Sequence, residues 1–158
     1  MSKFLYRMQN ILNLKRKLEE QAKMEYGVAR ARLNEEEEKL ARLQGRKADY
    51  EEEARSFLKK KLDLQKMREN KEAILRMDEF IELQKEEIQK AEEVVETARE
   101  KLQAAVQERK IHEKLRENAF EAFLLEEKAG ESREIDELTS YTYGQKRQEA
   151  AAEVQSEK

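Results

Sequence analysis

The chain has 158 residues, of which 44% are charged and 38% hydrophobic, and it carries a net charge of −3 with no proline and no cysteine. Because a globular domain is about 45–50% apolar, this composition excludes a thick multilayer core, and the length suits one domain. It also excludes disulfide and thiol chemistry, and no stretch has the character of a signal peptide or a membrane span. We therefore expect a cytoplasmic protein that does not insert into membranes.

The first arm carries apolar residues at helical spacing from residue 4 onward, and opposite charges alternate between them, which favours a solvated helix over disorder. The apolar positions are Phe4, Met8, Ile11, Leu18, Ala22, Tyr26, Ala29, Leu33, Leu40, Leu43, Tyr50, Ala54 and Phe57. The two steps of four from Leu18 to Tyr26 resemble a stutter in a coiled coil. With no proline to stop it, the pattern predicts a helix over about residues 3–67.

A turn is expected near residues 68–72. The apolar pattern loses its phase there, and Asn70 is the poorest helix former nearby. Folding back lets the chain bury its own apolar seam, which one straight helix would leave exposed.

The second arm has the most regular pattern in the chain. Its apolar positions alternate in steps of three and four, with only Gln84 as a break: Ile74, Met77, Ile81, Ile88, Ala91, Val95, Ala98, Leu102 and Ala105. This repeat is typical of helices that wrap around a partner helix. It predicts a second helix over about residues 73–143. Residues 145–158 are polar and are expected to form a frayed tail.

These elements predict an all-α fold in which two long helices form an antiparallel coiled-coil hairpin, with residues 1–144 as one domain. If the numbers of facing residues add up to about 142, apolar residues meet at three levels. The expected pairs are Leu18 with Leu124, Leu40 with Leu102, and Ala54 with Ile88.

Charge supports the same arrangement. Residues 1–33 carry a net charge of +5, and residues 126–158 carry −4. A hairpin of this register would lay the two ends side by side, whereas a parallel homodimer would stack like charges.

The chain offers little chemistry. His112 is the only histidine and has no neighbouring serine or cysteine, and no glycine-rich phosphate loop is present. The many carboxylates lack the desolvated pocket that glycosidase and two-metal sites need. We expect no catalytic residues, no metal and no cofactor, and hence no enzyme.

Two short basic clusters, residues 15–17 and 59–61, are too sparse for a basic region that reads DNA. We therefore expect no nucleic-acid partner. The ten aromatic residues are many for a narrow seam, so some are candidates for contacts with protein partners.

Three segments resemble the flagellar export protein FliJ family. Residues 4–15 (FLYRMQNILNLK), followed by Glu19 and Glu20, are similar to the opening of that family. Residues 74–81 (ILRMDEFI) are similar to the start of its second helix, and residues 133–138 (REIDEL) resemble its C-terminal signature. The resemblance covers about residues 3–144.

The resemblance implies a non-enzymatic component of the bacterial flagellar type III export apparatus, with a hairpin similar to the gamma subunit of rotary ATPases. In such a role the paired ends act as a stalk inside the ring of the export ATPase and promote its assembly and activity. The rest of the rod reaches the cytoplasmic part of the export gate membrane protein, and export chaperones are further partners. The implied location is the cytoplasmic side of the flagellar basal body.

The resemblance also implies site residues. Those expected to contact the ATPase are Arg7, Met8, Ile11, Lys15, Asp136, Glu137 and Leu138. Those expected to contact the gate are Leu43, Tyr50, Phe80 and Gln84. The sequence leaves open a stalk of a virulence type III secretion system, a homodimeric structural scaffold, and a chaperone that holds substrates.

Overall fold

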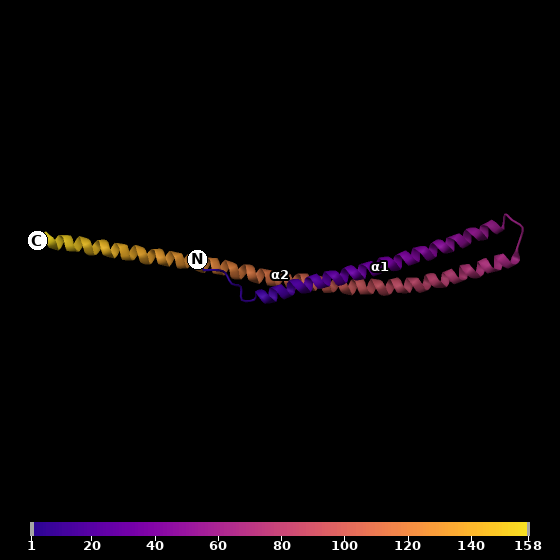
Figure 1. Cartoon of the computed structure of the whole chain (residues 1–158), viewed down its shortest axis with the longest axis horizontal. Coiled ribbons are helices and arrows are strands. Elements are labelled where there is room, and N and C mark those ends of the chain that lie inside the picture. Colours follow the sequence, from indigo (N-terminus) through magenta and orange to yellow (C-terminus); the bar gives the residue numbers. More distant parts are fainter. Residues whose placement is uncertain (1, 158) are drawn as a thin grey trace. The chain divides into compact units, whose positions relative to one another are not determined.

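Two long helices form the fold, in a computed structural model that describes residues 2–157 (Figure 1). Helix α1 spans Gln9–Phe57 and helix α2 spans Leu64–Ser156, so the predicted all-α helical hairpin is confirmed. Contacts divide the described chain into a hairpin unit, residues 15–109, and a terminal unit, residues 2–14 with 110–157. Met1 and Lys158, which the expected domain and tail include, lie outside the described residues.

The turn of the hairpin unit consists of residues 58–63, which connect the ends of the two helices where they lie side by side (Figure 1). The Asp63 side chain starts α2, because its Oδ1 accepts hydrogen bonds from the backbone N–H groups of Gln65 and Lys66, both at 3.2 Å. This is the bonding of an N-cap residue, which satisfies backbone donors that a helix start leaves open. The expected turn near residues 68–72 is therefore wrong, because the observed turn lies about ten residues earlier.

Asn70, on which the expected turn rested, is buried inside the hairpin. Its Nδ2 donates a hydrogen bond of 2.9 Å to the backbone carbonyl of Tyr50 on α1. The poor helix propensity of asparagine costs only a few tenths of a kcal/mol, and a buried cross-helix hydrogen bond offsets it.

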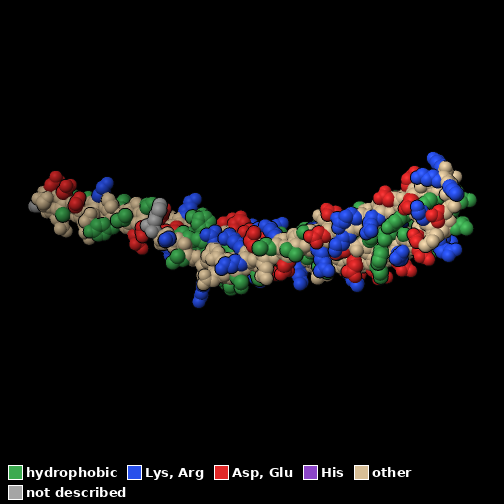
Figure 2. All heavy atoms as spheres, turned by 45° about the vertical axis from the view of Figure 1, so that its right-hand side comes forward, with side chains coloured by type: hydrophobic (Ala, Val, Ile, Leu, Met, Phe, Trp, Pro, Cys, Tyr) green, Lys and Arg blue, Asp and Glu red, His purple; other side chains and the backbone are tan. Residues whose placement is uncertain are grey.

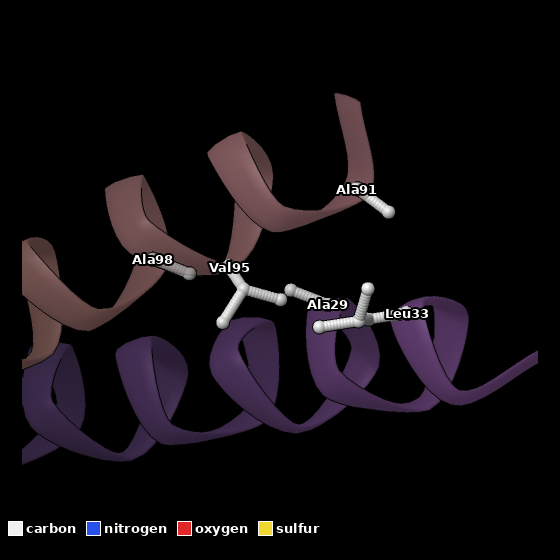
Figure 3. Packing of buried hydrophobic residues seen from close by; sticks show 5 residues of the cluster. All are labelled: Ala29, Leu33, Ala91, Val95 and Ala98. Atoms are coloured by element: carbon white, nitrogen blue, oxygen red, sulfur yellow. The ribbon is translucent and has the colours of Figure 1, made fainter. Parts of the chain in front are cut away.

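The centre of the hairpin unit is a thin apolar cluster, whose buried members are Ala29, Leu33, Ala91, Val95 and Ala98. Figure 3 shows Val95 of α2 pointing toward Ala29 and Leu33 of α1. The small alanine side chains allow the two helices to lie close together at this level of the seam. All the apolar seam positions expected between residues 74 and 105 are buried or half-buried, which confirms the predicted seam.

The buried face of α1 follows an unbroken alternation of three and four residues once polar residues are counted. Its positions are Lys15, Glu19, Ala22, Tyr26, Ala29, Leu33, Glu36, Leu40, Leu43, Lys47, Tyr50, Ala54 and Phe57, all buried or half-buried. Glu19 is 7% exposed, whereas Leu18 is 42% exposed. The expected stutter is therefore wrong: the seam uses Glu19 and leaves Leu18 at its edge.

The register follows from polar pairs between the two helices of the hairpin unit. Asn70 bonds Tyr50 and Gln84 bonds Glu36, so each pair of residue numbers adds up to 120. Arg109 bonds Glu19, a pair that adds up to 128. The expected sum of about 142 is wrong, and so are the three apolar pairs that were derived from it.

The terminal unit is held by an aromatic cluster. The ring of Phe4 lies 5.1 Å from that of Phe120 and 5.4 Å from that of Phe123, measured between centroids. The Arg116 guanidinium lies over Phe4 at 5.6 Å, and its Nε donates a hydrogen bond to the Gln9 side chain. The segment before α1 is thus fastened to α2 by edge-to-face and cation–π contacts.

Helix α2 continues beyond this cluster, and every described residue from 131 to 157 is exposed. It passes through Ser140, Thr142 and Gly144, where the helix was expected to end, and the stretch expected as a frayed tail is helical to Ser156. The oppositely charged ends are not paired as expected, because the segment before α1 contacts residues 116–123 instead.

Candidate partner-binding surfaces

The structure brings together part of the set expected to contact the gate, which lies wholly in the hairpin unit. Leu43 and Gln84 line one shallow groove together with Lys39, Arg42 and Arg46. Phe80 lies one turn before Gln84 on α2 and is about half exposed, so its ring is available to a partner.

Tyr50 lies two turns beyond Leu43 and borders a different groove, next to the turn. Its side chain is half-buried, and its backbone carbonyl accepts the hydrogen bond from Asn70. The structure therefore separates Tyr50 from the groove that holds Leu43 and Gln84.

Gln84 has a structural task of its own. Its Nε2 donates hydrogen bonds to the backbone carbonyl of Glu36 at 2.9 Å and to the Glu36 carboxylate. The hydrogen bond from Gln84, aided by nearby Lys39, lowers the pKa of the Glu36 carboxyl below its ordinary value. The residue that breaks the apolar pattern is thus a polar connection between the helices.

A second polar connection joins Glu19 of α1 to Arg109 of α2. The Arg109 guanidinium donates two hydrogen bonds to the Glu19 carboxylate, and Lys23 lies within ion-pair distance of the same group. The Arg109 hydrogen bond lowers the pKa of Glu19. At a third level the Lys47 ammonium lies 2.6 Å from Asp78, which raises the pKa of Lys47.

Acid is expected to weaken the hairpin through these carboxylates. The folded pKa values of Glu19 and Glu36 lie below the ordinary 4.5, so the unfolded chain binds more protons once the pH falls to that value. The contribution of the two groups to stability is therefore complete above pH 4.5 and is lost as the pH falls through the folded pKa values. Thermal unfolding followed by circular dichroism between about pH 7 and about pH 3 measures this loss.

The Glu19→Gln variant should lose part of the acid dependence, because it removes one of the carboxylates whose pKa the fold lowers. Glu25→Gln is the matched control, since Glu25 is exposed on the same helix and has the same side chain. Equal acid dependence of the wild type and Glu19→Gln would contradict the prediction.

The residues expected to contact the ATPase from the N-terminal side lie around the start of α1. Arg7, Met8 and Ile11 are exposed in the terminal unit. Lys15 lies in the hairpin unit, where it is half-buried and its Nζ lies 3.3 Å from Glu108. Its charge is therefore already engaged in an ion pair with α2.

Asp136, Glu137 and Leu138, expected to contact the ATPase from the C-terminal side, are exposed on α2. Leu138 is 66% exposed and lies fifteen residues beyond Phe123, about 22 Å along a helix axis. Within the terminal unit, the structure does not bring these residues to the level of the aromatic cluster that holds the chain's start.

An apolar strip around Leu138 was not predicted from the sequence. Ile135, Leu138, Thr142 and Tyr143 line one shallow hollow on α2 together with Thr139 and Lys146. We call these six residues the C-terminal strip. The spacing of three and four from Ile135 through Leu138 to Thr142 is the signal that could have revealed it.

Two further observations concern metal binding and membrane spanning. Among residues 2–157, no group of three or more histidine, aspartate or glutamate side chains gathers closely enough to hold a metal ion. Neither α1 nor α2, as far as they are described, contains a stretch apolar enough to cross a bilayer.

Comparison with known proteins gives a family. The sequence model described as "Flagellar FliJ protein" matches residues 3–148, which is nearly the whole chain. No curated protein and no solved structure matches the chain significantly. The family match covers α1, the turn and α2 as far as residue 148. The chain therefore belongs to the FliJ family of flagellar proteins, which is associated with type III protein export.

Proposed function

We propose that the chain is a non-enzymatic stalk that promotes ring assembly and activity of the flagellar export ATPase. In this role it also links the ATPase to the cytoplasmic part of the export gate and to export chaperones. It works in the cytoplasm at the base of the flagellum. The flagellar description of the matched family favours this role over a stalk of a virulence secretion system.

The observation that carries the proposal is the exposed apolar surface of α2 beyond the aromatic cluster. Every described residue from 131 onward is exposed, and the C-terminal strip offers leucine, isoleucine and tyrosine side chains to a partner. Tyrosine is among the residue types that dominate protein interfaces, and exposed apolar patches mark interaction sites. A helix that keeps this face uncovered suits contact with apolar side chains of a partner.

The hairpin unit supports the proposed gate contact. Phe80 is half-exposed one turn from the groove that holds Leu43 and Gln84, and Arg42 and Arg46 give the groove a positive rim. An acidic surface on the gate would complement that rim and steer association.

The test is the ATP hydrolysis rate of the purified export ATPase from the same bacterium, with and without the full chain at equal molar ratio. We expect a higher rate and more ring-sized particles in electron micrographs. An unrelated helical hairpin of similar net charge serves as the control. An unchanged rate, together with no complex in sedimentation at low salt, would contradict the proposal and leave a generic scaffold.

A further inference from the structure

The turn of the hairpin unit concentrates positive charge. Residues 55–71 contain seven lysines and arginines but only two acids, whereas the chain as a whole has a net charge of −3. Lys59, Lys60 and Lys61 lie consecutively in the turn and are exposed. Within residues 2–157 none of these three lysines forms an ion pair, so their charges face solvent.

The same turn exposes leucines. Leu58, Leu62 and Leu64 are 77%, 67% and 71% exposed, and they flank the three lysines on both sides. Figure 2 shows hydrophobic and basic side chains together at this end of the hairpin unit. A leucine in a solvated turn gains nothing from packing, so three of them beside a lysine triplet indicate a surface that something covers.

The local structure fixes how the turn presents these side chains. The backbone N–H of Leu58 bonds the Arg55 carbonyl at 3.3 Å, and that of Lys59 bonds the Ser56 carbonyl at 3.1 Å. At the other side, Asp63 Oδ1 accepts the two backbone hydrogen bonds that start α2. The leucines and lysines thus project from a short segment held at both ends.

We propose that residues 58–64, which are the turn and the first residue of α2, bind the surface of an anionic lipid bilayer. Lysines attract acidic headgroups, and leucines enter the boundary between headgroups and acyl chains. Long lysine stems allow the ammonium groups to stay at the headgroup level while the leucines go deeper. The turn lies at the surface and does not span the bilayer.

The exposed leucines favour a bilayer over other negatively charged partners. A nucleic acid would use the lysines but leave the leucines in water. An acidic protein would need a fitted pocket for each leucine, whereas a bilayer accepts all three without one. The inference is independent of the proposed ATPase role, because it needs only this chain and lipid.

The test is co-sedimentation of the full chain with vesicles. One set contains phosphatidylglycerol and phosphatidylcholine in equal parts, and the other contains phosphatidylcholine alone. We expect binding to the anionic vesicles only, weakened on the order of tenfold by high salt, because salt screens the headgroup charge. Absence of binding to anionic vesicles at low salt would overturn the proposal.

Two variants separate charge from apolar contact. Because each lysine near an anionic surface strengthens binding about fivefold, K59Q/K60Q/K61Q should bind about 100-fold more weakly. The matched control changes three exposed bases on the helices, namely K17Q/R30Q/K101Q, and should bind like the wild type. Equal losses in both charge variants would overturn the proposal, since they would show attraction by net charge alone.

The second variant, L58S/L62S/L64S, keeps every charge and should weaken vesicle binding about tenfold. Thermal unfolding should be unchanged in all variants, because the substituted side chains are exposed. A short oligonucleotide is titrated in parallel. If the leucine variant binds vesicles as well as the wild type does, and the oligonucleotide binds with similar affinity, the turn is a general polyanion site and the lipid proposal is overturned.

Discussion

Replacing Leu138 with aspartate is expected to abolish activation of the export ATPase while leaving thermal unfolding of the chain unchanged. Leu138 is 66% exposed, so the substitution removes no internal packing. On a partner it would place a charge in an apolar contact, which costs several kcal/mol and weakens binding more than about 100-fold. The hydrolysis rate as a function of chain concentration measures the loss, and circular dichroism checks the fold.

Val154→Asp is the matched control, because Val154 is an exposed apolar residue on the same stretch of α2 but lies outside the C-terminal strip. It should activate the ATPase like the wild type. Ile11→Asp asks whether the start of α1 contributes as well, and the proposed role predicts a reduced rate. Full activation by Leu138→Asp would show that the C-terminal strip does not bind the ATPase.

Replacing Val95 with aspartate is expected to destabilise the hairpin unit strongly. Val95 is 9% exposed and lies in the apolar cluster with Ala29 and Leu33. A carboxylate there finds no partner in the cluster, and its burial costs at least about 3 kcal/mol, a large part of the 5–15 kcal/mol that stabilises a typical domain. For a chain of this size, the midpoint of thermal unfolding should fall by about 10 °C or more.

Val94→Asp provides a control one residue away. Val94 is the same residue type on the same helix, but it is 53% exposed. Both variants lose the same helix propensity when valine becomes aspartate. The difference between their melting temperatures therefore measures the cost of burying the carboxylate. Similar melting temperatures would contradict the seam described for the hairpin unit.

The apolar pattern was sufficient to predict two long helices and the seam of the second, but not the helix bounds or the register. The second-arm positions from Ile74 to Ala105 are buried or half-buried as expected. An apolar repeat of 3.5 residues, however, matches itself again at each heptad shift, so several registers place apolar residues opposite one another. The wrong sum of 142 is one of these alternative registers.

Polar residues inside the seam select one of these registers. They are not found when only apolar residues are considered. Gln84 looked like a break and Asn70 like a turn, yet each donates a hydrogen bond across the hairpin. At another level Arg109 donates hydrogen bonds to the Glu19 carboxylate. Buried polar groups that need one particular partner specify register more sharply than leucines do. Asp63, a common N-cap residue, was the local signal for the true start of α2.

The candidate site could be predicted only in part. Family resemblance pointed to Leu138 and Phe80, and the structure places both on exposed surface. It could not reveal that Gln84 is engaged with Glu36 or that Lys15 pairs with Glu108, because such contacts depend on the register. The expected pairing of oppositely charged ends failed for the same reason.

The polar pairs also suggest an order in which the chain folds during synthesis. The pair Asn70–Tyr50 joins residues 20 apart, Gln84–Glu36 joins residues 48 apart, and Arg109–Glu19 joins residues 90 apart. Closing a short loop costs less entropy than closing a long one, so the turn can form first and the helices can zip together toward the termini. The ribosome releases α1 before α2, so Asn70, Gln84 and Arg109 emerge in this order, each after its partner on α1. Each new turn of α2 can then pack against a part of α1 that has already been synthesised. The register is set at Asn70 before the more repetitive apolar positions emerge.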